Sequence, residues 1–263
     1  MALEHYRMLD CTFPEVQEYL KTNQTIIIPY ALSEQHGAHL PLDVDIRNAD
    51  FISAKLAEQL GCLTAPTLNY TFSGGMLPGT INVKPNHFSA VMTDIMESLT
   101  VQGFRNIIIV PGHGGSESLE NLRESLRIAK WMNPYLHQTN MFLITFEDYS
   151  PLAHHAVFEE HDFHSGKLET SMMLAYRPDL VHMEKIAMDP PEVAERLRTD
   201  PDSYQDRKFR TNLPEEIATT SQRADVRVGV MGHPENADVE FGKAVLQELR
   251  ENLVPALKKA LEL

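Results

Sequence analysis

The stretch Ser33–Asp45, which reads SEQHGAHLPLDVD, is unusually rich in side chains able to bind a cation. They are Glu34, His36, His39, Asp43 and Asp45. Glu34 and His36 are two positions apart, so in extended backbone their side chains project from one face. Gly37 then allows the chain to turn, so that Asp45 can return to the same point. Carboxylate and imidazole donors without thiolate suit Zn²⁺, Mn²⁺ or Fe²⁺, and a carboxylate can bridge two ions.

Two more clusters with similar side chains follow later in the chain. The first is the glycine turn GHGG, Gly112–Gly115, directly after an apolar run. The second contains His154, His155, His161, His164 and Glu169. Glu169 precedes Met172 and Met173 by one helical turn, on the side expected to be buried. A buried carboxylate must be paired, protonated or bound to a metal, so Glu169 is a candidate ligand.

Each cluster also has a purely structural explanation. Asp-rich turns are commonly surface turns, and a glycine turn can simply let a helix pack closely. On spacing alone, the metal site and the structural explanation have roughly equal support. For His154, His155 and His161 a solvated loop is the favoured interpretation. For His164, beside Gly166 and five residues before Glu169, a functional role is favoured.

Short runs rich in Ile and Val alternate with helix-period segments, which indicates the elements that must position these clusters. Buried strands are predicted at Thr25–Ala31, Asn106–Val110 and Met141–Phe146. Helices are predicted at Ala49–Leu60, Phe88–Phe104 and Ser116–Met132. Strand, crossover helix and strand in this order predict an α/β fold with a mostly parallel sheet flanked by helices on both faces. The carboxyl ends of such strands are where ligands bind.

The predicted helices carry apolar side chains at helical spacing. These are Ile52, Leu56 and Leu60; Val91, Ile95 and Leu99; and Leu119, Leu122 and Leu126. Gly61 and Gly103 mark two helix ends, and Ser116 is predicted as an N-cap. The segment 188–227 is rich in Pro, Asp, Glu and Arg with little periodicity. It is expected to be a loop-rich excursion, either solvated or packed on a neighbouring subunit, from a single domain spanning 1–263.

A second set of expectations follows from composition. The chain has 263 residues, 43% hydrophobic and 23% charged, which is ordinary for a globular protein that folds without help from a metal. Its net charge of -14 argues against nucleic acid and anionic membranes as partners. Cys11 and Cys62 lie in no paired motif, and the N-terminus lacks a signal-peptide pattern. We therefore expect a soluble, cytoplasmic protein.

Five blocks of this sequence together resemble the creatininase (creatinine amidohydrolase) family. They are PYALSEQHGAHLPLDVD, PGTINV, VPGHGGSE, HSGKLETSMMLA and GVMGHPENADVEFG, in the order found in that family. The resemblance extends from about Ile26 to Gly242. It implies a creatininase-like three-layer sandwich, a two-metal site that hydrolyses C–N bonds of amides, and a homo-oligomer, often a hexamer.

The resemblance also implies roles for individual residues. Glu34 and His113 resemble ligands of one metal, His36 a ligand of the other, and Asp45 the bridge. His164 resembles the catalytic histidine. Glu169 is expected at the second metal or its water. In the implied reaction, a metal-activated water attacks a small cyclic amide, formamide or related amide, and His164 acts as general acid/base. The implied cofactors are two divalent ions, expected to be Zn²⁺, with Mn²⁺ or Fe²⁺ as alternatives.

The chain departs from the creatininase pattern at two kinds of position. Gly115 stands where creatininases carry a glutamate ligand of the second metal. The tryptophans that close over creatinine are also missing, since the only tryptophan is Trp131 in another predicted helix, and Glu160 stands four residues before His164. The substrate therefore stays open. One alternative is a metal-binding or regulatory protein without turnover, which would not need His164. A second is a metallophosphoesterase, which is less favoured because this chain has no basic phosphate-binding residues beside the clusters.

Overall fold

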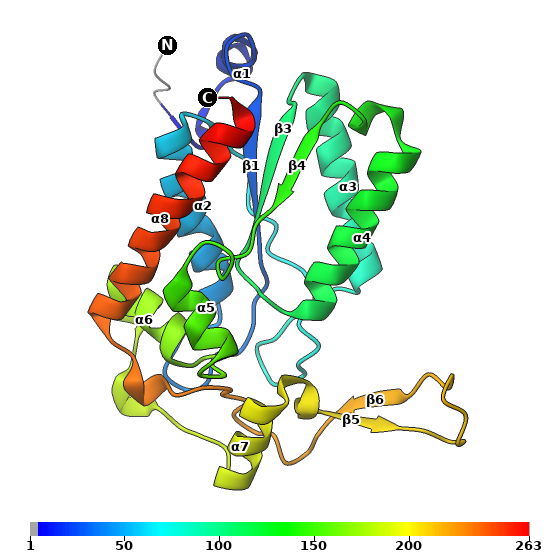
Figure 1. Ribbon diagram of the computed structural model, residues 1–263, viewed down its shortest axis with the longest axis vertical. Coiled ribbons are helices and arrows are strands. Elements are labelled where there is room, and N and C mark those ends of the chain that lie inside the picture. The colour runs from blue at the N-terminus through cyan, green and yellow to red at the C-terminus, as the bar shows by residue number, and fades with distance from the viewer. Residues whose placement is uncertain (1–4, 263) are drawn as a thin grey trace.

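The computed structural model describes residues 5–262 and shows a parallel sheet between two layers of helices (Figure 1). The strands are β1 (Thr25–Tyr30), β2 (Leu63–Thr64), β3 (Asn106–Pro111) and β4 (Asn140–Leu143). Their spatial order is β2-β1-β3-β4, and every neighbouring pair is parallel. The register aligns Tyr30 with Pro111, so the two central strands end side by side. The predicted parallel α/β fold is confirmed.

The central strands are apolar along their whole length because helices cover both faces of the sheet. Ile26–Ile28 of β1 and Ile107–Val110 of β3 are all fully buried. The short strand β2 was not predicted. It has only two residues and carries no periodic signal of its own.

The helices form the outer layers, with α2 and α8 on one side of the sheet and α3 and α4 on the other (Figure 1). The α-helices are α1 (Phe13–Leu20), α2 (Val44–Leu60), α3 (Pro85–Gln102), α4 (Ser116–Met132), α5 (Pro151–Phe158), α6 (Lys167–Tyr176), α7 (Pro191–Thr199) and α8 (Val239–Leu261). Helix α6 packs against α8, and its Met172 and Met173 are buried as predicted.

Element ends differ from the sequence-based expectation at several places, among them two boundaries and one N-cap. Helix α2 begins at Val44, five residues earlier than predicted, which places Asp45 in its first turn. Helix α4 begins at Ser116, so Gly115 occupies the N-cap position assigned to Ser116. Strand β4 ends at Leu143, because the chain leaves the sheet before the last apolar residues of the run. Apolar character alone does not separate a strand from the buried segment after it.

The buried face of α3 also differs from the prediction. Val91, expected to face the core, is 49% exposed, while Phe88, Met92 and Met96 are buried. This helix carries two adjacent apolar stripes, and packing onto the sheet decides which of them is covered.

The segment 188–227, expected to be a loop-rich excursion, holds short elements joined by loops. The segment contains α7 and an antiparallel hairpin of β5 (Gln205–Lys208) and β6 (Thr219–Gln222). The hairpin strands are polar and largely exposed, so they show no apolar alternation. The segment packs on this chain's own loop: Tyr204 Oη donates to Ser73 O at 3.2 Å, and Met76 N–H donates to Gln222 Oε1 at 2.9 Å.

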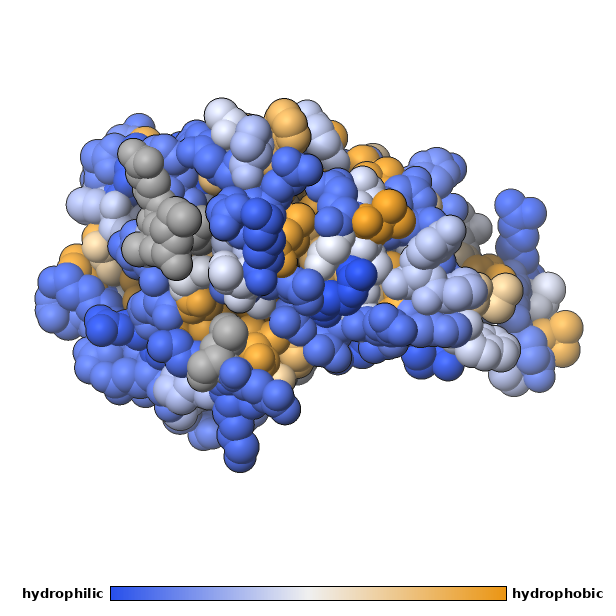
Figure 2. Space-filling model, turned by 90° about the horizontal axis from the view of Figure 1, so that it is seen from above, coloured by the Kyte–Doolittle hydropathy of each residue, from blue (hydrophilic) through white to orange (hydrophobic). Residues whose placement is uncertain are grey.

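The surface is mainly hydrophilic on the face that Figure 2 shows, and apolar residues form only small groups there. No helix among residues 5–262 combines the length and apolar character that crossing a bilayer requires.

Candidate metal centre

The predicted ligands meet where β1 and β3 end. Glu34 and His36 lie on the segment that leaves β1, and His113 follows β3. The two exits are tied together because Gly112 N–H donates to Tyr30 O at 2.8 Å. A Cβ atom at Gly112 would lie 1.9 Å from the backbone oxygen of Asp45, so this position requires glycine. That close approach brings the first turn of α2 against the end of β3.

Glu34, Asp45 and His113 form the first group of donors. His113 Nδ1 lies 3.1 Å from Glu34 Oε2 and 3.4 Å from Asp45 Oδ2. The donor atoms of all three side chains lie within 4.8 Å of one another. Glu34 is 7% exposed and Asp45 is 1% exposed, so this group is almost completely enclosed.

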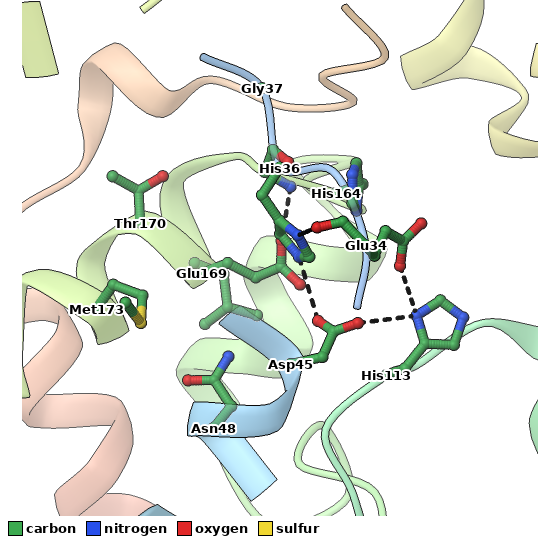
Figure 3. A network of polar contacts seen from close by, with 12 residues as sticks. Glu34, His36, Gly37, Asp45, Asn48, His113, His164, Glu169, Thr170 and Met173 are labelled. Carbon is green, nitrogen blue, oxygen red and sulfur yellow. Dashed lines mark hydrogen bonds and ion pairs between the residues drawn. The ribbon is translucent and has the colours of Figure 1, made fainter. Parts of the chain in front are cut away.

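His36, His164 and Glu169 form the second group, again with donors within 4.8 Å of one another. His36 Nε2 lies 3.1 Å from Asp45 Oδ1 and 3.6 Å from Glu169 Oε2. The two oxygens of Asp45 therefore face different groups, as Figure 3 shows. Glu34 and His36 both approach Asp45, as their two-residue spacing predicts, but they belong to different groups.

The donor atoms are arranged as metal ligands would be. Among the described residues, three buried donor atoms that face these sites make no hydrogen bond: Glu34 Oε2, His36 Nε2 and Asp45 Oδ2. Ligands about 2.0–2.2 Å from a tetrahedral ion lie roughly 3.4 Å apart, close to the separations seen here. Buried polar atoms without partners are costly unless a ligand satisfies them, so the residues fit divalent cations.

Burial and opposite charges act against each other on these groups. Burial alone would lower the pKa of His113, but Glu34 and Asp45 raise it to about 10. Burial acts in the same way on His36, yet Asp45 and Glu169 raise its pKa well above the ordinary value. Burial would raise the pKa of Asp45 and of Glu169, but His36 holds both below their usual ranges. Without an ion, the histidines and carboxylates therefore stabilise each other's charged forms.

His164 is held by the turn that precedes α6. Its Nε2–H donates to the backbone oxygen of Gln35 at 2.8 Å, which leaves Nδ1 free to accept a proton. The buried Asp162 carboxylate accepts from Lys167 N–H at 2.8 Å and Leu168 N–H at 2.7 Å. Ser165 N–H donates to Glu169 Oε2 at 2.6 Å. Two carboxylates therefore order the turn that carries His164.

Other histidines and acids of the three clusters lie outside both groups. His39 is buried but bonded to Thr170 Oγ1 at 3.0 Å, and burial lowers its pKa to about 4. Asp43 pairs with Arg47 at 2.6 Å. His154 and His155 are exposed on α5, so the predicted loop at these two residues was wrong. His161 is exposed in the turn after α5.

Three residues of the site were not predicted. Gln35 holds His164, Asp162 orders its turn, and Glu147 lies after β4 in the cavity beside the metal groups. Gln35 stands between two predicted ligands, which was a usable signal. Asp162 orders its turn through residues five and six positions later, whereas Glu147 reaches the cavity from a segment distant in the chain.

The two departures from the creatininase pattern have structural counterparts. A Cβ atom at Gly115 would lie 2.3 Å from His113 Nε2, so a longer side chain there does not fit this ring position. Trp131 is 74% exposed on α4, away from the donors. Glu160 forms an ion pair with Lys167 at 3.0 Å.

A cavity of about 200 Å³ lies beside the two groups and reaches Glu34, His113, His164 and Glu169. The segment 188–227 contributes part of its wall through Asp202 and Tyr204. A small cavity bordered by candidate ligands and a histidine with a free nitrogen is suited to hydrolysis of a small molecule.

Comparison with known proteins agrees with this arrangement. The family model Creatininase, described as creatinine amidohydrolase, matches residues 9–257. The chain belongs to the creatininase family. This membership confirms the family resemblance and the prediction of a hydrolase.

The relatives of this creatininase-family chain are distant. Creatinine amidohydrolase of Pseudomonas putida is 25% identical over 182 residues, which cover 63% of this chain and 69% of the relative. The mycofactocin precursor peptide peptidase of Mycolicibacterium smegmatis is 24% identical over 251 residues, which cover 89% of this chain and 84% of the relative. A crystal structure of creatinine amidohydrolase superposes with a TM-score of 0.79 at 21% identity over 98% of this chain and 99% of that one. The last match confirms the fold.

Proposed function

We propose that this chain is a metal-dependent amidohydrolase that cleaves a C–N bond of a small cyclic amide, formamide or related amide. Glu34, Asp45 and His113 would hold one divalent ion. His36, Asp45 and Glu169 would hold a second. The observation that carries this proposal is the placement of the two Asp45 oxygens, 3.1 Å from His36 Nε2 and 3.4 Å from His113 Nδ1.

Glu169 supplies the third ligand that the second ion needs. Gly115 has no side chain to offer, and zinc sites normally take at least three protein ligands. Glu169 Oε2 lies 3.6 Å from His36 Nε2, a separation that two ligands of one ion can have. The α6 carboxylate thus replaces the glutamate that creatininases carry at the position of Gly115.

The chain's own residues account for proton transfer. When bound, the two ions supply Lewis acidity, which polarises a carbonyl and makes water more acidic. His164 Nδ1 can take a proton from the attacking water and deliver it to the leaving nitrogen, because Nε2–H is already held by Gln35. An amide nitrogen leaves poorly unless it is protonated, so this transfer is required. Gly114 and Gly115 add no side chains to the cavity, which lets the substrate approach.

Zn²⁺ is the metal we propose, with Mn²⁺ as the next choice. Solved creatininases of the same fold include one described as a Mn form and one described as Zn–Zn type. The histidine and carboxylate donors suit both ions, and also Fe²⁺.

A homo-oligomer, a hexamer by the family resemblance, is part of the proposal. The connection between β5 and β6 presents three exposed apolar side chains, Phe209, Leu213 and Ile217. Exposed apolar groups at the end of a projecting hairpin are typical of contacts between subunits. Light scattering of the purified protein measures the assembly.

The decisive test of the function is metal analysis of protein purified without chelator, followed by a hydrolysis screen. Two equivalents of divalent metal per chain and turnover of an amide or formamide are expected. Creatinine should be turned over poorly, because no tryptophan is available to close over its ring. Metal-free protein that stays inactive after reconstitution with Zn²⁺ and Mn²⁺ would contradict the proposal.

A further inference from the structure

Glu147 lies in the cavity wall, and the proposed reaction gives its carboxylate no role. It follows β4, and its Oε1 lies 4.0 Å from the position of a Cβ atom on Gly114, next to His113. The Glu147 carboxylate is hydrogen-bonded to its own backbone N–H, and within residues 5–262 no other side chain forms a hydrogen bond or ion pair with it. Burial raises the pKa of Glu147, Asp148 and Glu169 raise it further, and the residue's own backbone N–H and His154 act in the opposite direction. Among the residues described, the cavity wall offers this carboxylate no lysine or arginine.

Glu147 is not arranged as a metal ligand. The candidate metal groups are Glu34, Asp45, His113 and His36, His164, Glu169, and Glu147 belongs to neither. It faces the same cavity as Glu34, which is 7% exposed and has an oxygen without a partner. The cavity wall therefore carries negative charge at two separate places where a cation could bind, at the metal groups and at Glu147.

The rest of the cavity wall supports the same conclusion. Glu117 and Asp202 also line it, and its described lining includes no lysine or arginine. Such a wall disfavours an anionic substrate and attracts a cationic one. A half-buried carboxylate makes its strongest contacts with charged N–H donors, because charge-assisted hydrogen bonds exceed neutral ones.

We propose that Glu147 is a specificity-determining residue that binds an ammonium or amidinium group of the substrate, while the scissile amide reaches the metal centre. This inference rests on the proposed hydrolase function and narrows it to amides that carry a cationic N–H group. The cation would lie beside Gly114, between Glu147 and the metal groups. The substrate's charge would then offset the burial of the carboxylate.

Benzamidine and benzamide test the inference, because they share a shape and differ in charge. Binding of each is measured by calorimetry to the metal-loaded protein, to Glu147→Gln and to Glu120→Gln. Glu120 is exposed on α4, so Glu120→Gln is a control that removes the same charge at a position away from the cavity. The wild type and Glu120→Gln should bind benzamidine about tenfold or more tightly than benzamide, as one charge-assisted hydrogen bond predicts. Glu147→Gln should lose most of that preference with its metal content unchanged.

Other results overturn the inference. Equal binding of the two probes, no binding of benzamidine, or a preference that survives in Glu147→Gln would show that Glu147 does not select a cation. Loss of metal in Glu147→Gln would make Glu147 a ligand instead. Metal analysis of the wild type keeps the two proposals apart: a wild type that binds no metal defeats the hydrolase function, whereas a metal-loaded wild type without the probe preference defeats only this inference.

Discussion

The two proposed metal sites share Asp45 but are built in different ways. Glu34, Asp45 and His113 follow the ends of β1 and β3 and the start of α2, where sheet register and the contact at Gly112 hold them. His164 and Glu169 depend on a turn and on α6, and the Glu169 side chain is 21% exposed. The first group is enclosed, while the second borders the cavity. We infer that the first ion is held more tightly and that the second group acts on the substrate.

Asp45→Ala should have the largest effect, because it removes the residue that both groups share. Both ions should be lost, and hydrolysis should fall to background. Metal content per chain, measured after gel filtration, checks this. Asp43→Ala, two residues away and paired only with Arg47, should keep both ions. Two full equivalents of metal in Asp45→Ala would remove the bridge from the assignment.

His164→Ala separates catalysis from metal binding within the second group. The turnover number should fall by about 10²–10⁴-fold, the usual loss when a general acid/base is removed. Metal content should stay at two, because His36, Asp45 and Glu169 remain. His154→Ala, which changes an exposed histidine on α5, should behave as the wild type. Loss of one ion from His164→Ala would make His164 a ligand.

Glu169→Gln tests whether the second ion depends on α6. Affinity for one ion should fall by at least about 10–100-fold, while the other stays bound and hydrolysis drops severely. Titration of the metal-free protein with Zn²⁺ resolves the two sites. His113→Ala should show the opposite pattern and weaken the first ion. Unchanged metal content with reduced thermal stability in Glu169→Gln would indicate that this carboxylate only orders the turn, through Ser165.

Gly115→Ala should have the smallest effect and should act on the first group alone. The added Cβ atom would lie 2.3 Å from His113 Nε2, so the ring must leave the position in which its Nδ1 faces Glu34 and Asp45. Affinity for the first ion should fall by roughly tenfold. In Gly114→Ala the new atom meets only Glu147 Oε1 at 4.0 Å, an ordinary contact, so metal affinity should not change. Equal affinities in both variants would show that the ring can move without cost.

Sequence patterns were sufficient for the parallel sheet and for most of the residues in the site. Continuous apolar runs in β1 and β3 indicated strands buried on both faces, and polar residues directly after them indicated a site at the carboxyl edge. Val91 and the segment 188–227 show where sequence patterns were not sufficient. Two apolar stripes on α3 were equally plausible, and a polar hairpin has no apolar alternation to detect.

The sequence by itself determined which donors are available, because residue type and local spacing are local properties. Glu34, His36, Asp45, His113, His164 and Glu169 were all identifiable on that basis. Only the tertiary structure decided how they divide into two groups and which oxygen of Asp45 faces each. Glu147 joins the site only through the tertiary fold, because it comes from a segment far from Glu34 in the chain. Distances between such segments depend on packing, which no local pattern encodes.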